Sequence, residues 1–273
     1  MMIDAETRLY GLFGNPVGHS LSPAMHNAAF KEKEINAAYL AFGLENAQAA
    51  LAAMRTLNMG GASVTIPHKT DVMAHLDEVD EMAARIGAVN TIVNRRGRLV
   101  GFNTDVTGAM RALNACGGVK GKRVLVIGAG GAARAIAFGI SEAGGELVIA
   151  NRTEKRAESL AHELFATFQP LKGVSLKGVD VLINTTSVGM APNIDEAPVA
   201  LSELSSETLV MDIVYNPLET ALLSGARAVG CETIDGVAMF VGQAVAQFEL
   251  WTGLEAPEAL MQSVVMRSLK RNR

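Results

Sequence analysis

Short apolar runs alternate with helical patterns along the first third of the chain. Three apolar runs predict strands, and the two segments between them have the apolar spacing of amphipathic helices. In chain order these five elements are expected at 8–13, 22–35, 38–42, 45–57 and 61–66. Two further extended segments, 86–93 and 98–103, flank Asn94-Arg95-Arg96-Gly97, which has the composition of a turn. This alternation predicts an α/β fold.

The second half of the chain repeats the alternation with more apolar strands. A helix that starts near Asp105 ends at Gly117-Gly118, and we expect a domain boundary in or just before it. Strands are then expected at 123–127, 147–150, 179–184, 208–213 and 232–234, with helices after residue 130, at 153–168 and after Pro217. Parallel strands joined through helices form a doubly wound sheet. From Met239 to Trp251 the pattern is again helical.

Composition narrows the class of protein. With 273 residues two domains are the default, and 49% hydrophobic against 19% charged residues is enough apolar material for a sizeable core. The formal net charge is −4, and the only run of like charges is the short basic end at Lys270, Arg271 and Arg273. We therefore expect no nucleic-acid partner.

The cysteines and the lack of long apolar segments indicate the cellular compartment of the protein. Cys116 and Cys231 are too few for a disulfide scaffold, which fits a reducing compartment. Residues 1–7 contain Asp4 and Glu6 and lack the apolar stretch of a signal peptide, and the longest uncharged stretch of the last third is 236–248. We expect a cytoplasmic protein with no membrane partner.

A glycine-rich turn follows the strand at 123–127. Gly128, Ala129, Gly130, Gly131, Ala132 and Ala133 fit the pattern G-x-G-x-x-A directly before a helix. The first glycine permits the tight turn, the second lets the backbone approach a pyrophosphate, and Ala133 keeps helix and strand close. The pattern predicts a Rossmann-type dinucleotide-binding domain, and the alternative is a glycine turn without a ligand.

The end of the next strand distinguishes two cofactors. NAD sites usually carry Asp or Glu about 20 residues beyond the first glycine. Here the strand ends in Asn151-Arg152-Thr153, with Arg156 one turn later. A guanidinium matches a phosphate, and a cation in the first turn of a helix opposes the helix dipole unless an anion lies nearby. The pattern favours the 2′-phosphate of NADP; the alternative is that Thr153 caps the helix and both arginines are solvated.

Ser20, Ser22 and Lys69 are candidates for a substrate site. Ser22 is expected to be an N-cap with Pro23 at the first helical position, whereas Ser20 has no such explanation. Two hydroxyls in a strand-to-helix loop suit a polyhydroxylated ligand. Lys69 stands at an expected helix start, where a cation opposes the dipole, and this local conflict favours an acid/base role. Its alternative is a solvated surface lysine.

Asn90 and Asp105 lie at expected element ends. Their neighbours also form caps and turns, so an N-cap role for Asp105 competes with a functional one. The five histidines form no spacing typical of metal ligands, and we expect no metal.

Nine motifs in order along nearly the whole chain resemble those of the shikimate dehydrogenase family. They are NPVGHSLSP at 15–23, GASVTIPHK at 61–69, GAVNT at 87–91, GFNTD at 101–105, GAGGAAR at 128–134, NRT at 151–153, NTTSVGM at 184–190, YNP at 215–217, and DG at 235–236 with GQ at 242–243. One such motif is weak, whereas nine in order are highly specific. One departure is Ser63, where many relatives have asparagine, and it bears on details around the substrate.

The resemblance implies a reaction and a set of catalytic groups. The reaction is the reversible reduction of 3-dehydroshikimate to shikimate by NADPH, on the chorismate route to aromatic amino acids. Lys69 and Asp105 would form the catalytic pair, with the lysine donating a proton to the developing alkoxide. The residues implied to hold the carboxylate and hydroxyls of the substrate are Ser20, Ser22, Thr65, Asn90, Tyr215 and Gln243.

The resemblance also implies how the cofactor is held. The turn from Gly128 to Ala133 would hold the pyrophosphate, and Thr186, Gly236 and Met239 would lie along the nicotinamide. The residues implied to bind the adenosine phosphate are Asn151, Arg152, Thr153 and Arg156.

The family's domain plan is expected here as well. It implies a smaller α/β substrate domain that is discontinuous in sequence, at 1–107 and 239–273, and a Rossmann-type NADP-binding domain at 108–238. We expect a monomer or a homodimer.

Two rival functions stay open. A quinate/shikimate dehydrogenase would accept the extra hydroxyl of quinate and would use NAD as well, although Arg152 and the lack of an acid at the strand end argue against NAD. A nucleotide-sensing module that has lost turnover is the other, and the presence of both Lys69 and Asp105 argues against it.

Overall fold

The computed structural model describes residues 3–271, so Met1, Met2, Asn272 and Arg273 lie outside it. The chain divides into two compact units of nearly equal length: unit 1, Met1–Thr104 with Gln243–Arg273, and unit 2, Asp105–Gly242. Unit 1 is thus discontinuous in sequence. Two helices, α4 (Thr104–Ala115) and α8 (Gly236–Thr252), contain the points where the chain passes between units, and the expected boundaries at 107 and 239 fall in the same helices.

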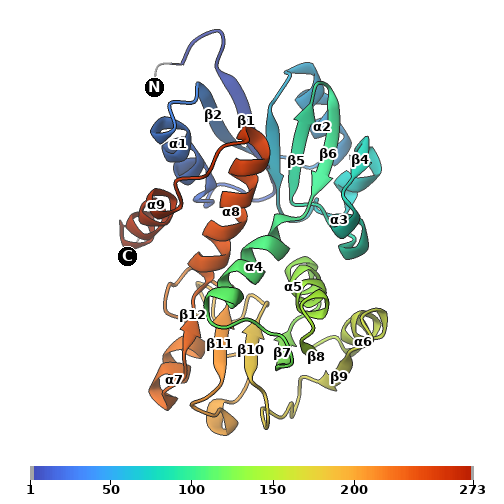
Figure 1. Ribbon diagram of the computed structural model, residues 1–273, viewed down its shortest axis with the longest axis vertical. Helices are drawn as coiled ribbons and strands as arrows, with labels where there is room; N and C mark the ends of the chain where they lie inside the picture. Colours follow the sequence, from blue (N-terminus) through green and yellow to red (C-terminus); the bar gives the residue numbers. More distant parts are fainter. Residues whose placement is uncertain (1–2, 272–273) are drawn as a thin grey trace. The chain divides into compact units, whose positions relative to one another are not determined.

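Unit 1 is built on a mixed six-stranded sheet (Figure 1). In spatial order its strands are β2 (Ala37–Gly43), β1 (Arg8–Gly14), β3 (Gly61–Val64), β5 (Thr91–Arg95), β6 (Arg98–Phe102) and β4 (Glu78–Val79). β2, β1 and β3 run parallel, whereas β5 is antiparallel to both β3 and β6. The carboxyl ends of β1, β3 and β6 and the amino end of β5 therefore meet at one edge of the sheet.

Helices cover both faces of this sheet. Unit 1 contains the helices α1 (Ser22–Glu32), α2 (Ala47–Thr56), α3 (Glu81–Ile86) and α9 (Glu258–Arg271), the short 3₁₀ helix η1 (Asp71–His75) and the second part of α8, from Gln243. Side chains of β1 point alternately to the two faces of the sheet. On one face the Tyr10 ring lies 5.1 Å from the Phe30 ring and 5.2 Å from the Trp251 ring, measured between centroids. On the other face Phe13 belongs to the same hydrophobic core as Leu51 of α2. α1 and α9 pack side by side (Figure 1).

Unit 2 is built on a parallel six-stranded sheet. In spatial order its strands are β12 (Thr233–Ile234), β11 (Leu209–Asp212), β10 (Val181–Asn184), β7 (Arg123–Ile127), β8 (Glu146–Asn151) and β9 (Thr167–Pro170). Every neighbouring pair is parallel. The chain runs outward from β7 to β9, returns to the centre, and runs outward again from β10 to β12. This is the doubly wound order of a Rossmann-type domain, with its topological switch point between β7 and β10.

The helices of unit 2 pack closely because their contact residues are small. They include α5 (Gly131–Glu142), α6 (Glu154–Glu163), α7 (Ala221–Val229) and the short 3₁₀ helix η2 (Leu201–Glu203), together with α4. In α5, Gly139 lies so near α4 that a Cβ there would come within 2.8 Å of both Val106 and Met110. No helix within residues 3–271 has the length and apolar character needed to cross a membrane.

Three expected elements differ in their bounds. The helix expected at 153–168 ends at Glu163, because Phe165 takes a positive φ of 52° and the chain then adds β9 to the edge of the sheet beside β8. The extended segment expected from residue 86 begins only at β5, since Ile86 ends α3, with Gly87 as its left-handed C-cap. The first helix ends at Glu32, before Glu34 at φ 54°.

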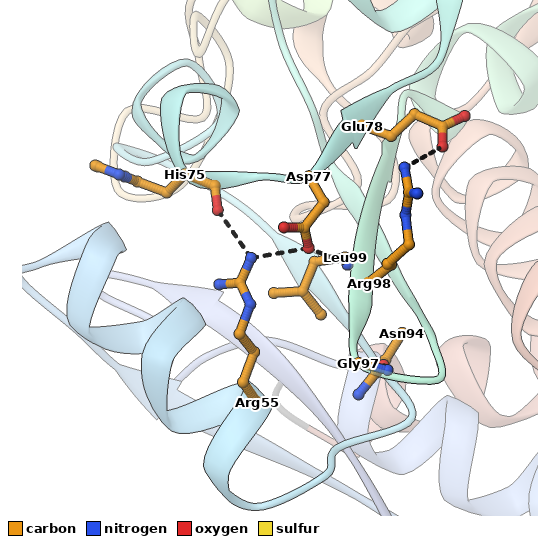
Figure 2. A network of polar contacts seen from close by, with 8 residues as sticks. All are labelled: Arg55, His75, Asp77, Glu78, Asn94, Gly97, Arg98 and Leu99. Atoms are coloured by element: carbon orange, nitrogen blue, oxygen red, sulfur yellow. Dashed lines mark hydrogen bonds and ion pairs between the residues drawn. The ribbon is translucent and has the colours of Figure 1, made fainter.

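A network on the surface of unit 1 holds the segment that follows residue 70 (Figure 2). Asp77 Oδ2 accepts hydrogen bonds from Arg55 Nη2 at 2.9 Å and from the backbone N–H of Leu99 at 2.7 Å. Arg55 Nη2 also donates to the carbonyl oxygen of His75 at 3.3 Å. Asp77 thus connects α2, η1 and β6. The Leu99 N–H, followed by the Arg55 guanidinium, holds the pKa of Asp77 below its usual value of 3.8.

We expect Asp77→Asn to flatten the acid limb of the stability profile. A carboxylate whose folded pKa is depressed stabilises the fold above its unfolded pKa and loses this contribution as the pH falls through the folded value. The free energy of unfolding should therefore drop less between about pH 5 and pH 2 in the variant than in the unaltered protein. Denaturant titrations across this range measure it, with exposed Asp195→Asn as the control; equal acid limbs for all three proteins would contradict the prediction.

Candidate functional site

The glycine turn of unit 2 lies at the switch point of its sheet. Gly128 follows β7 with φ +123°, and a Cβ there would collide with Thr185 Oγ1, so the turn needs glycine at this position. Thr185 follows β10, and its backbone N–H donates to the carbonyl oxygen of Ile127 at 2.9 Å. The turn after β7 and the loop after β10 are therefore neighbours where an open α/β sheet binds its ligand.

The rest of the turn leaves room for a ligand. A Cβ added at Gly130 or Gly131 would meet nothing within 4 Å, so the backbone is open to approach there. Gly130 is the N-cap of α5 and supplies no capping side chain, so the N–H groups of the first turn of α5 have no side-chain cap. Ala133 is fully buried. Free donors at a helix N-terminus suit an anionic pyrophosphate, and the residues present fit a dinucleotide.

No acid stands in the three residues Asn151-Arg152-Thr153 at the carboxyl end of β8, and three cations follow there and in the first turn of α6, with Glu154 among them. Arg152, Lys155 and Arg156 are exposed, and the guanidinium groups of Arg152 and Arg156 form no hydrogen bond or ion pair within residues 3–271. Thr153 is the N-cap of α6 but makes no side-chain capping bond; Asn151 Nδ2 instead donates to the Thr153 carbonyl oxygen at 3.0 Å. Thr153 thus occupies the expected N-cap position without a side-chain capping bond, and the solvated alternative for the two arginines stays open; both guanidinium groups are available to a phosphate.

Thr186 is held by a buried amide. Asn184, the last residue of β10, accepts hydrogen bonds at Oδ1 from the Thr186 N–H at 3.0 Å and from the Thr186 hydroxyl at 2.7 Å. The Thr186 oxygen in turn accepts from the Val188 N–H at 3.2 Å. The methyl group of Thr186 lies toward Gly128, 3.4 Å from where a Cβ of that residue would stand.

Tyr215, Gly236 and Met239 also belong to unit 2. The Tyr215 ring stacks on Phe240 with centroids 4.8 Å apart and planes at 25°, and burial raises the pKa of its phenol. A Cβ at Gly236 would lie 2.5 Å from the backbone of Ile213 and Val214, so only glycine lets α8 begin this close to β11. Met239 is buried.

In unit 1 the remaining candidates gather at the edge where β1, β3 and β6 end. Ser20 lies in the loop after β1, Thr65 and Lys69 follow β3, and Asn90 directly precedes β5. The Thr65 N–H donates to the carbonyl oxygen of Phe13 at 2.8 Å, which joins the first two loops. Hydroxyl, amine and amide groups thus share one sheet edge although they are far apart in the sequence.

The expectation that Ser22 is an N-cap is wrong. Helix α1 has Leu21 as its N-cap, with helical φ and ψ, and Ser22 is its first residue. Ser22 is buried beside the Tyr39 phenol, while Ser20 Oγ accepts from the Ser22 N–H at 3.2 Å. Ser20, for which the sequence offers no structural explanation, thus forms the local turn before the helix.

The α-helix expected at Lys69 is also wrong. Residues 66–70 form a turn, followed by the five-residue 3₁₀ helix η1 from Asp71. Lys69 is half-buried, and its carbonyl oxygen accepts from the Val89 N–H at 2.8 Å. That bond places the Lys69 backbone beside the residue that precedes Asn90. A helix dipole therefore does not explain Lys69, whereas its position at the shared edge does.

The side chain of Asn90, which lies outside α4 in the sequence, accepts a hydrogen bond from the first N–H group of that helix. Its Oδ1 accepts from the Thr104 N–H at 2.7 Å, from the Thr104 hydroxyl at 3.1 Å and from the Thr91 hydroxyl at 2.8 Å. Asp105 is the second residue of α4 and is buried, so it is not the N-cap that the sequence alternative proposed. The structure instead has the Asn90 amide oxygen bonded to the first N–H of the helix that carries Asp105.

A buried polar network behind this edge was missed by sequence reasoning. Gln247 Oε1 accepts from the Ser63 hydroxyl at 2.8 Å and from His26 Nε2 at 3.3 Å, and Gln247 Nε2 donates to Thr91 Oγ1 at 3.1 Å. Ser63 itself accepts from the Tyr39 hydroxyl at 2.7 Å. The available signal was a second glutamine on a mostly apolar helix, four residues after Gln243.

The network consists of neutral groups. Burial lowers the pKa of His26 to about 3, so the imidazole is neutral and its Nε2 carries the proton that Gln247 accepts. Burial raises the pKa of Tyr39 as well. Ser63, the departure from the family pattern, is therefore part of a hydrogen-bonded core that supports Thr91 and Asn90. No group of three or more His, Cys, Asp and Glu side chains in the described part of the chain could hold a metal ion.

Comparisons with known proteins cover both units. Three family profiles match: "Shikimate dehydrogenase substrate binding domain" at residues 12–92, "Shikimate / quinate 5-dehydrogenase" at 110–220, and "Shikimate 5'-dehydrogenase C-terminal domain" at 236–266. The chain is 44% identical to the shikimate dehydrogenase (NADP(+)) of Methanocaldococcus jannaschii, over 99% of this chain and 100% of that protein.

Solved structures of shikimate dehydrogenases are similar to this chain as well. A crystal structure of shikimate dehydrogenase in complex with NADP+ is similar at a TM-score of 0.96 and 44% identity, over 98% of each chain. Shikimate 5-dehydrogenase from Thermus thermophilus, in complex with NADP(H) and shikimate, is similar at a TM-score of 0.90 and 37% identity, over 96% of this chain and 100% of that one. Because the likeness runs through both units and nearly the full length of each relative, this chain belongs to the shikimate dehydrogenase family.

Proposed function

We propose that this chain catalyses the reversible, NADPH-dependent reduction of 3-dehydroshikimate to shikimate, a step toward the aromatic amino acids. The observation that carries the proposal is the shared edge of the unit 1 sheet, where hydroxyl, amide and amine groups suited to a hydroxylated acid stand together. The dinucleotide turn of unit 2 complements it. The free thiols of Cys116 and Cys231 suit a cytoplasmic enzyme.

NADP(H) is the cofactor, and unit 2 contains the groups that would hold it. The N–H groups at the start of α5 would face the pyrophosphate, and Arg152, with Arg156, would pair with the 2′-phosphate. Thr186, Gly236 and Met239 would line the nicotinamide. When bound, the cofactor supplies the hydride.

Lys69 and Asp105 are the proposed catalytic pair. In the direction of reduction Lys69 donates a hydrogen bond to the carbonyl oxygen of the substrate and then a proton as negative charge builds there. In the reverse direction it accepts the hydroxyl proton. Asp105 orients the ammonium group. The backbone bond from Val89 to Lys69 and the cap from Asn90 to α4 fix the two backbone positions.

The carboxylate and hydroxyls of the substrate would be held by polar side chains. The proposed residues are Ser20, Ser22, Thr65, Asn90, Tyr215 and Gln243. A site that pairs hydroxyls discriminates strongly, because an analogue leaves buried polar groups without partners. Quinate differs in the other direction: it carries one further hydroxyl, which would be buried without a partner in a site built for shikimate, and this cost is the basis of the first experiment.

We expect shikimate with NADP+ to be the preferred pair of substrates. Steady-state kinetics with shikimate or quinate, each with NADP+ or NAD+, measure this by nicotinamide absorbance. A kcat/KM for quinate equal to or above that for shikimate would favour the quinate/shikimate dehydrogenase. Binding of NADP+ without turnover of either acid would favour the nucleotide-sensing module.

Lys69→Ala should lower kcat by about 10²- to 10⁴-fold with a much smaller change in the KM of shikimate. The reason is that its hydrogen bond strengthens only as charge develops on the oxygen. Asp105→Asn should also slow turnover, and the double variant should lose less than the sum of the two effects, because the pair acts as a unit. Lys120→Ala, at an exposed lysine, is the control. Additive losses, or a large rise in KM at normal kcat, would contradict the catalytic pair.

Arg152→Ala should weaken NADP+ much more than NAD+, by about 1.5 to 3 kcal/mol, because only NADP+ carries the 2′-phosphate. The ratio of kcat/KM for the two cofactors measures this effect. Lys155→Ala removes a neighbouring exposed cation of α6 and should leave the ratio nearly unchanged. An equal loss for both cofactors would show that Arg152 does not contact the phosphate.

A further inference from the structure

Asp212, the last residue of β11, is a fully buried acid with only neutral partners. Its Oδ1 accepts from Asn184 Nδ2 at 3.0 Å and from the Val214 N–H at 3.0 Å, and its Oδ2 accepts from the Thr220 hydroxyl at 2.7 Å. Burial raises the pKa of Asp212, while these three hydrogen bonds lower it. No cation of the described chain compensates its charge, although removing a carboxylate from water is costly.

Two of the residues that hydrogen-bond Asp212 lie in or next to segments that carry candidate site residues. Asn184 is the amide that holds Thr186, and Val214 precedes Tyr215 in the chain. Thr220 is the N-cap of α7 and accepts from the Leu223 N–H at 3.3 Å. A single carboxylate therefore ties the loop after β10 to the loop after β11, on the side of the switch point away from β7.

The Asp212 carboxylate and the Val188 carbonyl oxygen together specify the orientation of the Asn184 amide. Because both only accept hydrogen bonds, Asn184 turns its NH₂ group toward them, donating to Asp212 Oδ1 at 3.0 Å and to the Val188 carbonyl oxygen at 3.2 Å. The Asn184 oxygen then faces Thr186 and accepts from both its N–H and its hydroxyl. A flipped amide would place NH₂ hydrogens against these two donors. The methyl group of Thr186 faces the glycine turn only as long as its hydroxyl stays on Asn184.

We propose that Asp212 is a positioning residue for the nicotinamide end of the cofactor, acting through Asn184 on Thr186. The inference rests on the proposed function, because Thr186 is assigned to the nicotinamide side there. Asp212 does not itself touch the cofactor. It acts on one half of the dinucleotide site only, since the phosphate-binding cations follow β8 on the opposite side of the sheet centre.

The test compares two ligands that share the adenosine half. NADP+ carries a nicotinamide, whereas adenosine 2′,5′-bisphosphate has only the adenosine with its 2′- and 5′-phosphates. In Asp212→Ala we expect the Kd of NADP+ to rise about tenfold, as for one lost hydrogen-bonded anchor, with the Kd of the bisphosphate nearly unchanged. Calorimetric titration of the full chain measures both constants.

Three further variants sharpen the comparison. Asp212→Asn should bind NADP+ nearly normally, because its oxygen can accept from Asn184 and Val214 while its NH₂ donates to Thr220. Asn184→Ala removes the acceptor for Thr186 and should reproduce the selective loss of NADP+. Asp195→Ala, at an exposed acid, should change neither ligand.

Each outcome decides between a positioning role and a structural one. Equal weakening of both ligands in Asp212→Ala and Asn184→Ala, loss of bisphosphate binding in both, or no change in either variant would overturn the proposal. If Asp212→Ala does not fold, the same comparison in Asn184→Ala decides. Failure of the unaltered protein to bind NADP+ would instead refute the proposed function.

Discussion

Both units depend on one constraint. Where the strands of a sheet end, the polar groups of the following loops no longer take part in the hydrogen bonds between strands, so those that are buried need other hydrogen-bond partners. Each unit meets it with an asparagine at its sheet edge. In unit 1 the Asn90 oxygen accepts from the N–H and hydroxyl of Thr104. In unit 2 the Asn184 oxygen accepts from the N–H and hydroxyl of Thr186. A candidate site segment begins at each of these threonines.

Each of these amides is supported from behind by a further buried side chain. Gln247 Nε2 donates to Thr91, which donates to Asn90, and Asp212 accepts from Asn184. Such chains have a defined direction, since every donor must meet an acceptor, and a fully satisfied buried network keeps its members in one arrangement. These two networks therefore hold the loops at Asn90 and Asn184 in one conformation. Close approaches at Gly128 and Gly236 add a steric limit, because a Cβ at either position would collide with a neighbouring loop.

The chemistry of the site follows from this arrangement. Lys69 and Asp105 act on one oxygen in the proposed reaction, and that requires precise backbone positions more than it requires unusual side chains. The Lys69 carbonyl and the start of α4 are both fixed by Val89 and Asn90, the two residues that directly precede β5. In the proposed cofactor site the cations after β8 are exposed and, within residues 3–271, lack such support.

The sequence alone determined the alternation of strands and helices, the glycine turn before α5 and the lack of an acid at residues 151–153, where β8 ends. These features are local: a period of apolar residues, a positive φ or a residue type at a strand end is visible within a few positions. Tertiary structure decided the rest. Ser22 looked like a cap, yet the fold brings Tyr39 to its hydroxyl, and Lys69 looked like a helix start but precedes only η1. The partners of Asn90 and Asn184 come from other segments. The packing of α8 on the unit 1 sheet brings Gln247 to Asn90, and the pairing of β10 with β11 brings Asp212 to Asn184.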